Sequence, residues 1–270
     1  MGPEWTMRVG GELPVEVRRD HIVRVVEERG HARVDELAAQ FGVSEVTVRS
    51  DLANLERNGR IRRVRGGAVA TSEAASERPF EEMLGDRADE KQRIGAVAAR
   101  LLVPGETVLL DVGTTTTAVA RAMVAREELR EVVVFTNGLT IALELEVAIP
   151  RLSVVVTGGT LRPLQHSLVD PLADTVLDGV HADTVILGCN GVEPTAGVTN
   201  INLPEAAVKR RMCAAAQRRI VVADGSKLGR VSLAPLCTID EVHVVVTSAS
   251  ADPRVVDRLR DTGVRVEVAR

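Results

Sequence analysis

The chain has 270 residues, a formal net charge of −4 and 45% hydrophobic residues. That length accommodates one small and one medium-sized domain, and the composition excludes a disordered or membrane-embedded protein. No apolar run approaches the roughly 20 residues that span a bilayer, and the first sixteen residues lack the basic start and apolar core of a secretion signal. We therefore expect a two-domain cytoplasmic protein with a flexible extension at residues 1–16.

The first predicted domain, residues 17–70, begins with the pattern of a helix, a tight turn and a second helix. Leu37 and Phe41 share one face of a helix that starts at Asp35. Gly42 can end that helix in the left-handed conformation, and Ser44 is suited to cap the next one.

The second helix carries its apolar residues Val48, Leu52 and Leu55 on one stripe, which leaves its N-terminal polar residues free to meet base edges in a major groove. Residues 61–65 read as a strand, and Gly66 and Gly67 form a turn dipeptide. The succession predicts a winged helix-turn-helix.

The charge of this region supports a nucleic-acid partner. Residues 18–70 hold eleven arginines against eight acidic residues, a net charge of +3, so the rest of the chain carries −7. Neutralising the phosphates of double-stranded DNA requires a positive charge. The alternative is that these arginines only form a solvated surface.

Residues 71–89 are polar, contain a proline and show no sustained period, so they read as a linker. In residues 90–270, short β-branched runs alternate with helical stretches, which predicts an α/β domain built on a mainly parallel sheet. The predicted strands are 107–110, 132–135, 152–156, 184–187, 220–223, 242–246 and 264–268.

Small and polar residues follow most of these strands, at the edge where ligands of parallel sheets bind. Glycines there let the backbone approach a ligand, and the Gly113–Thr117 run opens a helix whose free N–H groups suit a phosphate. The loops are 111–117, 136–138, 157–159, 188–191 and 224–227.

Neither a nucleotide P-loop nor a G-x-G-x-x-G fingerprint is present, so we predict no nucleotide cofactor and favour a small phosphorylated metabolite. Only three of the 34 basic residues are lysines, and Lys209 and Lys227 lie where an ammonium could meet a phosphate or sugar oxygen. The cysteines Cys189, Cys213 and Cys237 fit neither a disulfide framework nor a structural zinc site, and we predict no metal.

The first domain resembles a known family. The run V-D-E-L-A-x-x-F-x-V-S-x-x-T-V-R-x-D-L-x-x-L-E-x-x-G-x-I-x-R-x-x-G-G-A is similar to the winged helix-turn-helix of the DeoR-type bacterial transcriptional regulators. Ser50 stands where family members usually carry a second arginine, and Arg65 where they carry a histidine. The resemblance implies operator contacts by Ser44, Thr47, Arg49 and Ser50, and phosphate or minor-groove contacts by Arg63 and Arg65.

The second domain resembles the same family, through E-x-P-F at 77–80, D-x-G-T-T-T at 111–116, T-N-G at 136–138, E-A-x-V-K-R at 205–210 and D-x-S-K-x-G at 224–229. This resemblance implies a sensor domain similar in fold to ribose-5-phosphate isomerase and the CoA transferases, with phosphorylated sugars as effectors. The implied effector-binding residues are Asp111, Gly113, Thr114, Thr115, Asn137, Gly159, Lys209, Asp224 and Lys227.

We therefore expect a DNA-binding transcriptional repressor of a carbohydrate-catabolism operon, switched by a phosphorylated sugar and acting as a homo-oligomer, either a dimer or a tetramer, on paired half-sites. The competing hypothesis is a sugar-phosphate isomerase fused to a DNA-binding module, in which Asp111, Glu205, Asp224 and Lys227 would act as acids and bases. A DNA-binding protein with a vestigial pocket is a third possibility.

Overall fold

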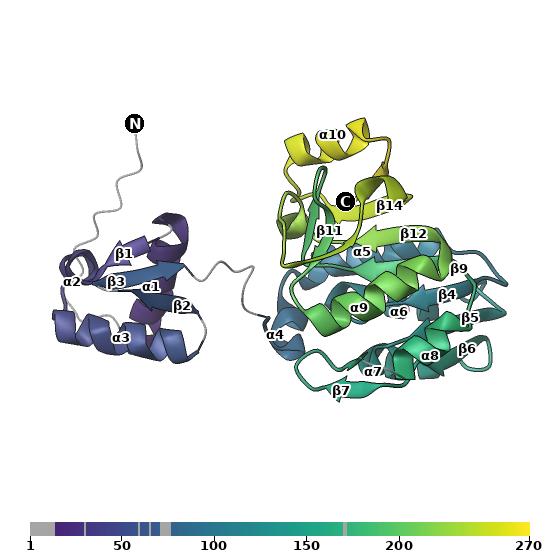
Figure 1. Ribbon diagram of the computed structural model, residues 1–270, viewed down its shortest axis with the longest axis horizontal. Coiled ribbons are helices and arrows are strands. Elements are labelled where there is room, and N and C mark those ends of the chain that lie inside the picture. Colours follow the sequence, from purple (N-terminus) through teal and green to yellow (C-terminus); the bar gives the residue numbers. More distant parts are fainter. Residues whose placement is uncertain (1–13, 30, 59, 65, 71–76, 170–171) are drawn as a thin grey trace. The chain divides into compact units, whose positions relative to one another are not determined.

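The computed structural model describes residues 14–29, 31–58, 60–64, 66–70, 77–169 and 172–270. The chain divides into two compact units, and the second unit begins at Glu77. Each unit has buried apolar clusters of its own. The ribbon in Figure 1 labels the elements of both.

The described part of the first unit contains three helices and a small antiparallel sheet in the order β1-β3-β2. The elements are α1 (Val15–Arg29), β1 (His31–Arg33), α2 (Val34–Phe41), α3 (Glu45–Arg57), β2 (Ile61–Val64) and β3 (Gly67–Ala70). Helix α1 therefore starts inside the predicted extension, residues 1–16, of which residues 1–13 lie outside the described part of the chain.

The turn between α2 and α3 forms as its sequence predicts. Gly42 adopts a left-handed φ of 65° and donates its N–H to the carbonyl of Ala38, and Ser44 caps α3. On α3, Val48, Leu52 and Leu55 are at most 1% exposed. Burying each such leucine contributes roughly 1.5–3 kcal/mol, so this stripe fixes which face of α3 remains outside.

The second unit is built on a seven-stranded sheet in the order β15-β14-β12-β9-β4-β5-β6. Every neighbouring pair in it is parallel. The strands are β4 (Thr107–Leu110), β5 (Val132–Thr136), β6 (Leu152–Val156), β9 (Ala182–Gly188), β12 (Ala216–Val222), β14 (Val244–Ser248) and β15 (Arg265–Ala269). The predicted parallel α/β sheet is thereby confirmed, and its seven predicted strands are these seven.

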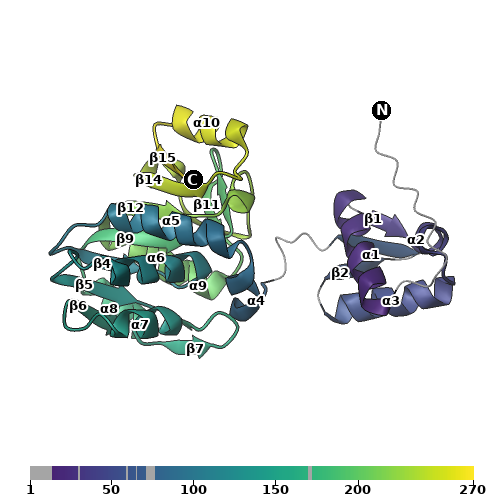
Figure 2. The same ribbon diagram turned by 180° about the vertical axis from the view of Figure 1, so that it is seen from behind.

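Helices cover both faces of this sheet. One face packs against α5 (Ala88–Arg100), α6 (Thr114–Ala125) and α7 (Leu139–Glu146), which Figure 2 shows in front of the strands. The other packs against α8 (Leu172–Asp178), α9 (Leu203–Ala214) and α10 (Pro253–Asp261). Successive residues of one strand face opposite sides of the sheet. On β4, Leu110 packs in the cluster with α5, α6 and α7, and Leu109 packs in the cluster with α8, α9 and α10.

Two small antiparallel sheets add to this frame. The hairpin of β7 (Thr160–Arg162) and β8 (Ser167–Val169) follows β6, and a three-stranded sheet pairs β10 (Gly191–Glu193), β11 (Gly197–Asn200) and β13 (Ala234–Cys237). Short 3₁₀ turns occupy Gly225–Lys227 and Ile239–Glu241. Strands this short contain too few residues for a sequence period, and we did not predict them.

Residues 77–89 belong to the second unit, although their polar sequence reads as the end of the linker predicted at 71–89. They include α4 (Phe80–Gly85) and the start of α5. Phe80 is only 3% exposed and its N–H donates to the carbonyl of Leu164 at 2.8 Å. A tertiary contact, which local composition does not reveal, holds this segment in the fold. Residues 71–76 lie outside the described part.

Candidate nucleic-acid interface and ligand site

The first turns of α3 carry the four side chains predicted to read DNA. Ser44 accepts a hydrogen bond from the Thr47 N–H at 3.1 Å, and the two hydroxyls lie 2.9 Å apart. Arg49 is exposed and pairs with Glu45 at 2.7 Å. Ser50 is exposed, and its hydroxyl makes no hydrogen bond to a described residue. A surface pair spaced i,i+4 contributes only about 0.3–0.5 kcal/mol, so Arg49 can exchange Glu45 for a base at little cost.

The predicted wing follows α3. The Arg63 main chain donates to Glu56 at 2.9 Å, while the Arg63 guanidinium is 44% exposed and 4.0 Å from the same carboxylate. Gly66, with a φ of 84°, makes the turn between β2 and β3. Arg65 lies outside the described residues, so its contact stays a prediction.

A buried acid on α3 was missed by the sequence analysis. Asp51 is 2% exposed and pairs with Arg18 at 2.7 Å and with Arg19 at 2.9 Å, both on α1. Its spacing could have revealed this burial, because Asp51 falls at i+3 from Val48, on the stripe of α3 that packs inward. Two charge-assisted contacts therefore fix α3 against α1.

In the second unit, Asp111 follows β4 and Lys209 lies on α9, and they form a buried ion pair at 2.5 Å. The Lys209 ammonium also donates to the Gly188 carbonyl at 3.0 Å, and the Gly188 N–H donates to Asp111 at 3.0 Å. Lys209 is thus neutralised within the fold, and its side chain is only 4% exposed. It differs in this respect from the free point charge that we expected.

Two buried polar atoms beside this pair lack a hydrogen-bond partner among the described residues, the Asp111 Oδ1 and the Asn137 Nδ2. The other Asn137 atom, Oδ1, accepts from the Val112 N–H at 3.0 Å, which holds the ends of β4 and β5 together. An unmade buried hydrogen bond costs roughly 1–3 kcal/mol. One acceptor and one donor are therefore available there for a ligand hydroxyl.

The N-terminus of α6 lies directly after Asp111. Its cap is Gly113, with a φ of 140°, and no side chain caps its amides. The Thr116 and Thr117 hydroxyls donate back to the Gly113 carbonyl at 2.9 and 2.7 Å, whereas the half-buried Thr114 and Thr115 hydroxyls have no bond to a described residue. Free amides and hydroxyls at a helix N-terminus suit an anion.

The other predicted residues lie after strands on either side of β4, because β12 and β6 are each two positions from β4 in the sheet. Asp224 follows β12 and accepts from the Ser226 N–H at 3.0 Å, with the Arg87 guanidinium 3.8 Å away. Lys227 is half-buried and makes no ion pair with any described residue. Gly159 follows β6, with a φ of 124°.

Cys189 follows β9, the strand that separates β4 from β12 in the sheet. It therefore lies between Asp111, which follows β4, and Asp224, which follows β12. Burial raises the pKa of its thiol to about 12, and the charges of Lys209, Lys227 and Asp224 also act on it. The thiol is therefore protonated at neutral pH and a poor nucleophile.

The ion pair itself has an unusual electrostatic setting. Burial raises the pKa of Asp111 to about 6, although Lys209 pulls it down. Burial lowers the pKa of Lys209, but the carboxylates of Asp111 and Glu205 outweigh that effect and leave it raised. At neutral pH both groups are charged, so a ligand hydroxyl would meet a carboxylate at Asp111.

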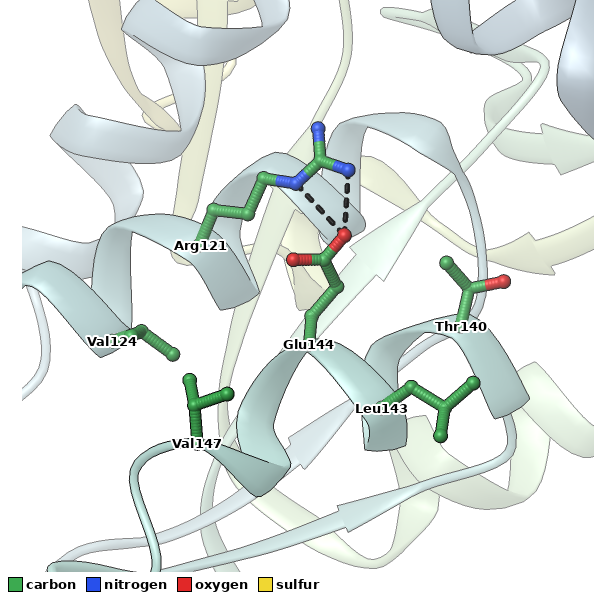
Figure 3. Close-up of a pocket in the computed structure, with 6 residues that line it drawn as sticks. All are labelled: Arg121, Val124, Thr140, Leu143, Glu144 and Val147. Carbon is green, nitrogen blue, oxygen red and sulfur yellow. Dashed lines mark hydrogen bonds and ion pairs between the residues drawn. The ribbon is translucent and has the colours of Figure 1, made fainter.

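A separate surface pocket of about 400 Å³ lies between α6 and α7 (Figure 3). Val124, Leu143 and Val147 line it, and Arg121 reaches across to Glu144 at 2.6 Å. Leu143 and Val147 are 68% and 76% exposed. None of the predicted effector residues lines this pocket, and its apolar side chains suit another protein surface better than a polar metabolite.

Comparison with known proteins decides the family. Residues 18–74 match the DeoR-like helix-turn-helix domain, and residues 86–249 match the DeoR C terminal sensor domain. The chain belongs to the DeoR family. It is 33% identical to the HTH-type transcriptional regulator GlpR of Haloferax volcanii, over 94% of this chain and 97% of that one. It is 28% identical to the glycerol-3-phosphate regulon repressor of Escherichia coli, over 93% of this chain and 98% of that one.

Likeness to solved structures is partial. Ribose 5-phosphate isomerase A of Methanocaldococcus jannaschii aligns with 18% identity and a TM-score of 0.40, over 53% of this chain and 55% of that one. The family assignment depends on the sequence matches instead.

This DeoR-family chain is a transcriptional regulator with a DNA-binding domain and a sensor domain. Its named relatives are regulators, which rejects the competing assignment to the sugar-phosphate isomerases. Within the described residues, no three His, Cys, Asp or Glu side chains gather to hold a metal, and no helix is both long and apolar enough to cross a membrane.

In the sensor domain of this DeoR-family regulator, polar residues outside the predicted effector-binding set also lie at the strand ends. The Ser248 hydroxyl accepts from the Gly225 N–H at 2.8 Å and donates to Glu90 at 2.5 Å, which ties α5 to the ends of β12 and β14. The hydroxyl of the neighbouring Thr247 is buried without a partner among the described residues. Thr247 and Ser248 both end β14, and this strand-end position is the sequence feature that indicates a place near the site.

Proposed function

We propose that this chain represses a carbohydrate-catabolism operon and that a phosphorylated sugar, bound at the carboxyl ends of the sensor strands, changes its affinity for operator DNA. The observation that carries the sensor half is the unpaired acceptor of Asp111 and the unpaired donor of Asn137, next to the uncapped N-terminus of α6. Such a site complements a molecule with both a hydroxyl and an anionic group.

The effector residues divide by chemistry. Asp111 and Asn137 would bind sugar hydroxyls, while the backbone at Gly113 and the hydroxyls of Thr114 and Thr115 would receive the phosphate. The half-buried ammonium of Lys227 would supply the countercharge, since Lys209 is already paired. Gly159 would let the backbone approach the ligand, and Asp224 would orient the loop through Ser226.

The DNA half rests on α3 and the wing. Ser44, Thr47, Arg49 and Ser50 would contact base edges or the adjacent backbone, and Arg63 and Arg65 would bind phosphate or enter the minor groove.

A relative that is a glycerol-3-phosphate regulon repressor supports a phosphorylated polyol as the effector class. Couplings between two ligands are typically about 1–3 kcal/mol, or roughly 5- to 150-fold in affinity, which suffices for a switch.

The direct test is a fluorescence-anisotropy titration of the full chain with a duplex from its own upstream region. It is run with and without glycerol 3-phosphate, D-ribose 5-phosphate and D-glucose 6-phosphate, and with inorganic phosphate for comparison. We expect at least one sugar phosphate to shift the dissociation constant by about fivefold or more. If none of the sugar phosphates changed the duplex affinity, the proposal of effector control would be rejected. If the chain bound no duplex at low ionic strength, the whole proposed function would be rejected.

We infer further that the regulator is a homo-oligomer, either a dimer or a tetramer. Paired half-sites in DNA require paired readers. The pocket between α6 and α7 supports one contact surface, because Leu143 and Val147 are apolar and exposed and lie beside both a cation, Arg121, and an anion, Glu144. A two-fold interface must be self-complementary, and a patch that carries both signs is compatible with that requirement.

A further inference from the structure

The segment that begins the sensor domain, residues 77–80, is bound by the β7–β8 hairpin. The Arg162 guanidinium binds Glu77 at 2.6 Å, and both side chains are less than 20% exposed. The Phe80 N–H donates to the Leu164 carbonyl at 2.8 Å, and the ring of Phe80 lies 5.1 Å from that of His166. Glu77 is the residue at which the second unit starts.

The same hairpin is bonded to the ligand site. On β8, the Leu168 N–H donates to the Asn137 carbonyl at 2.7 Å, and Ser167 pairs with Gly138. The Ser167 hydroxyl also donates at 2.6 Å to Glu205, in the first turn of α9. Asn137 therefore has its side chain at the proposed effector and its main chain on the hairpin.

One arginine joins the two sets of contacts. Arg162 binds Glu205 at 2.5 Å as well as Glu77, so a single guanidinium is shared by two carboxylates. Glu205 precedes Lys209 by one turn on α9, and its charge acts on both Lys209 and Asp111. Direct contacts thus join Asp111 to Lys209, and Glu205 through Arg162 to Glu77. One turn of α9 and the charge of Glu205 connect the two sets.

We propose that Arg162 relays occupancy of the strand-edge site to the start of the sensor domain, by dividing its guanidinium between Glu205 and Glu77. This inference rests on the proposed effector function and names its route. A phosphate at α6 alters the electrostatic potential around the Asp111–Lys209 pair and hence at Glu205. The hold of Arg162 on Glu77 then changes, because two carboxylates compete for one fork of donors.

The test in the presence of effector uses the Glu77→Gln variant of the full chain. Whichever of the three sugar phosphates shifts duplex affinity in the unmodified protein is then titrated against the variant. We expect the shift to fall from about fivefold or more to less than about twofold, while the affinity for the sugar phosphate itself changes by less than about threefold. A shift of unmodified size in Glu77→Gln overturns the relay.

Glu106→Gln is the matched control. Glu106 forms a similar partly buried pair with Arg218 at 2.8 Å. It precedes β4 and so lies at the amino ends of the strands, whereas the site lies at their carboxyl ends. We expect this variant to keep the full shift. An equal loss in both variants would mean general destabilisation rather than a relay, and would also overturn the proposal.

A second test needs no effector and remains decisive if none of the phosphates acts. The double variant Asp111→Asn/Lys209→Met removes both charges of the pair without leaving either one unpaired. Hydrogen exchange of a peptide covering 77–85 is compared with that of the unmodified chain, and we expect a change of at least about threefold. Glu205→Gln is the milder variant should the double variant not fold, and unchanged exchange in a folded variant rejects the relay independently of the effector.

Discussion

At the scale of single residues, Asp111 combines two requirements that oppose each other. It is completely buried, which favours the neutral acid, and it is paired with an ammonium, which favours the carboxylate. The first effect is the larger, since the pKa is raised to about 6. A site that maintains such a carboxylate at neutral pH does so at a cost in stability.

This cost predicts a pH dependence. Because the folded pKa of Asp111 exceeds its unfolded value, the folded state holds more protons between about pH 4 and pH 6. The contribution of Asp111 to stability is therefore greatest at low pH and is lost as the pH rises through about 6, by as much as about 3 kcal/mol. Urea unfolding at a series of pH values should show this decline in the unmodified chain and not in Asp111→Asn. Parallel curves for the two proteins would contradict it.

On the DNA side, Arg49 and Arg63 should behave differently. Arg49→Ala is expected to weaken operator binding by about 1–3 kcal/mol and to relax base preference at one position, since base contacts specify. Arg63→Ala should weaken binding to all duplexes alike and lower the salt slope by about 1. Anisotropy titrations on operator and scrambled duplexes at several salt concentrations distinguish the two. Arg258→Ala in the sensor domain, an exposed arginine paired with Glu193, is the control.

At the scale of elements, the orientation of the recognition helix depends on Asp51. Its contact with Arg18 is buried and its contact with Arg19 is partly buried, unlike the exposed pair of Arg49 and Glu45 on α3. Removing one partner of a buried ion pair leaves the other uncompensated, which typically costs about 3–5 kcal/mol.

Asp51→Asn should therefore destabilise the first unit by about 3 kcal/mol or more, a large part of the stability of so small a domain, and should reduce operator binding with it. Thermal unfolding followed by circular dichroism gives the first quantity and anisotropy the second. Glu45→Gln, which breaks only the exposed pair with Arg49, should change stability by less than about 0.5 kcal/mol. Equal effects of the two substitutions would mean that the contacts of Asp51 with α1 stabilise the first unit no more than an exposed ion pair does.

At the scale of the whole molecule, the DNA-binding domain and the sensor domain are separate units, and the proposed homo-oligomer would bring copies of both together. Leu143→Asp puts a charge into the proposed contact between α6 and α7 and should raise the subunit dissociation constant by about tenfold or more. Sedimentation velocity measures this directly. Leu233→Asp changes an equally exposed leucine outside that pocket and should leave the association unchanged. Identical sedimentation of both variants and the unmodified chain would exclude this surface.

The sequence by itself determined the two-part organisation, the helix-turn-helix and all seven strands of the parallel sheet. It could do so because those features are local. Gly42 and Ser44 define a turn from their own chemistry, and the run at 184–187 is continuous because both faces of that strand are buried. The strand-end residues followed from the general rule on where parallel sheets bind ligands.

Only the tertiary structure decided what those residues contact. Lys209 reads as a free cation, yet it lies against Asp111, 98 positions earlier in the chain, and Glu77 reads as linker until Arg162 is placed beside it. The spacing of Asp51 places it on the inward stripe of α3, but only the fold shows that it pairs with Arg18 and Arg19 on α1. Pairings between distant residues have no local period or propensity to announce them, because they form only when the hydrophobic cores bring the elements together.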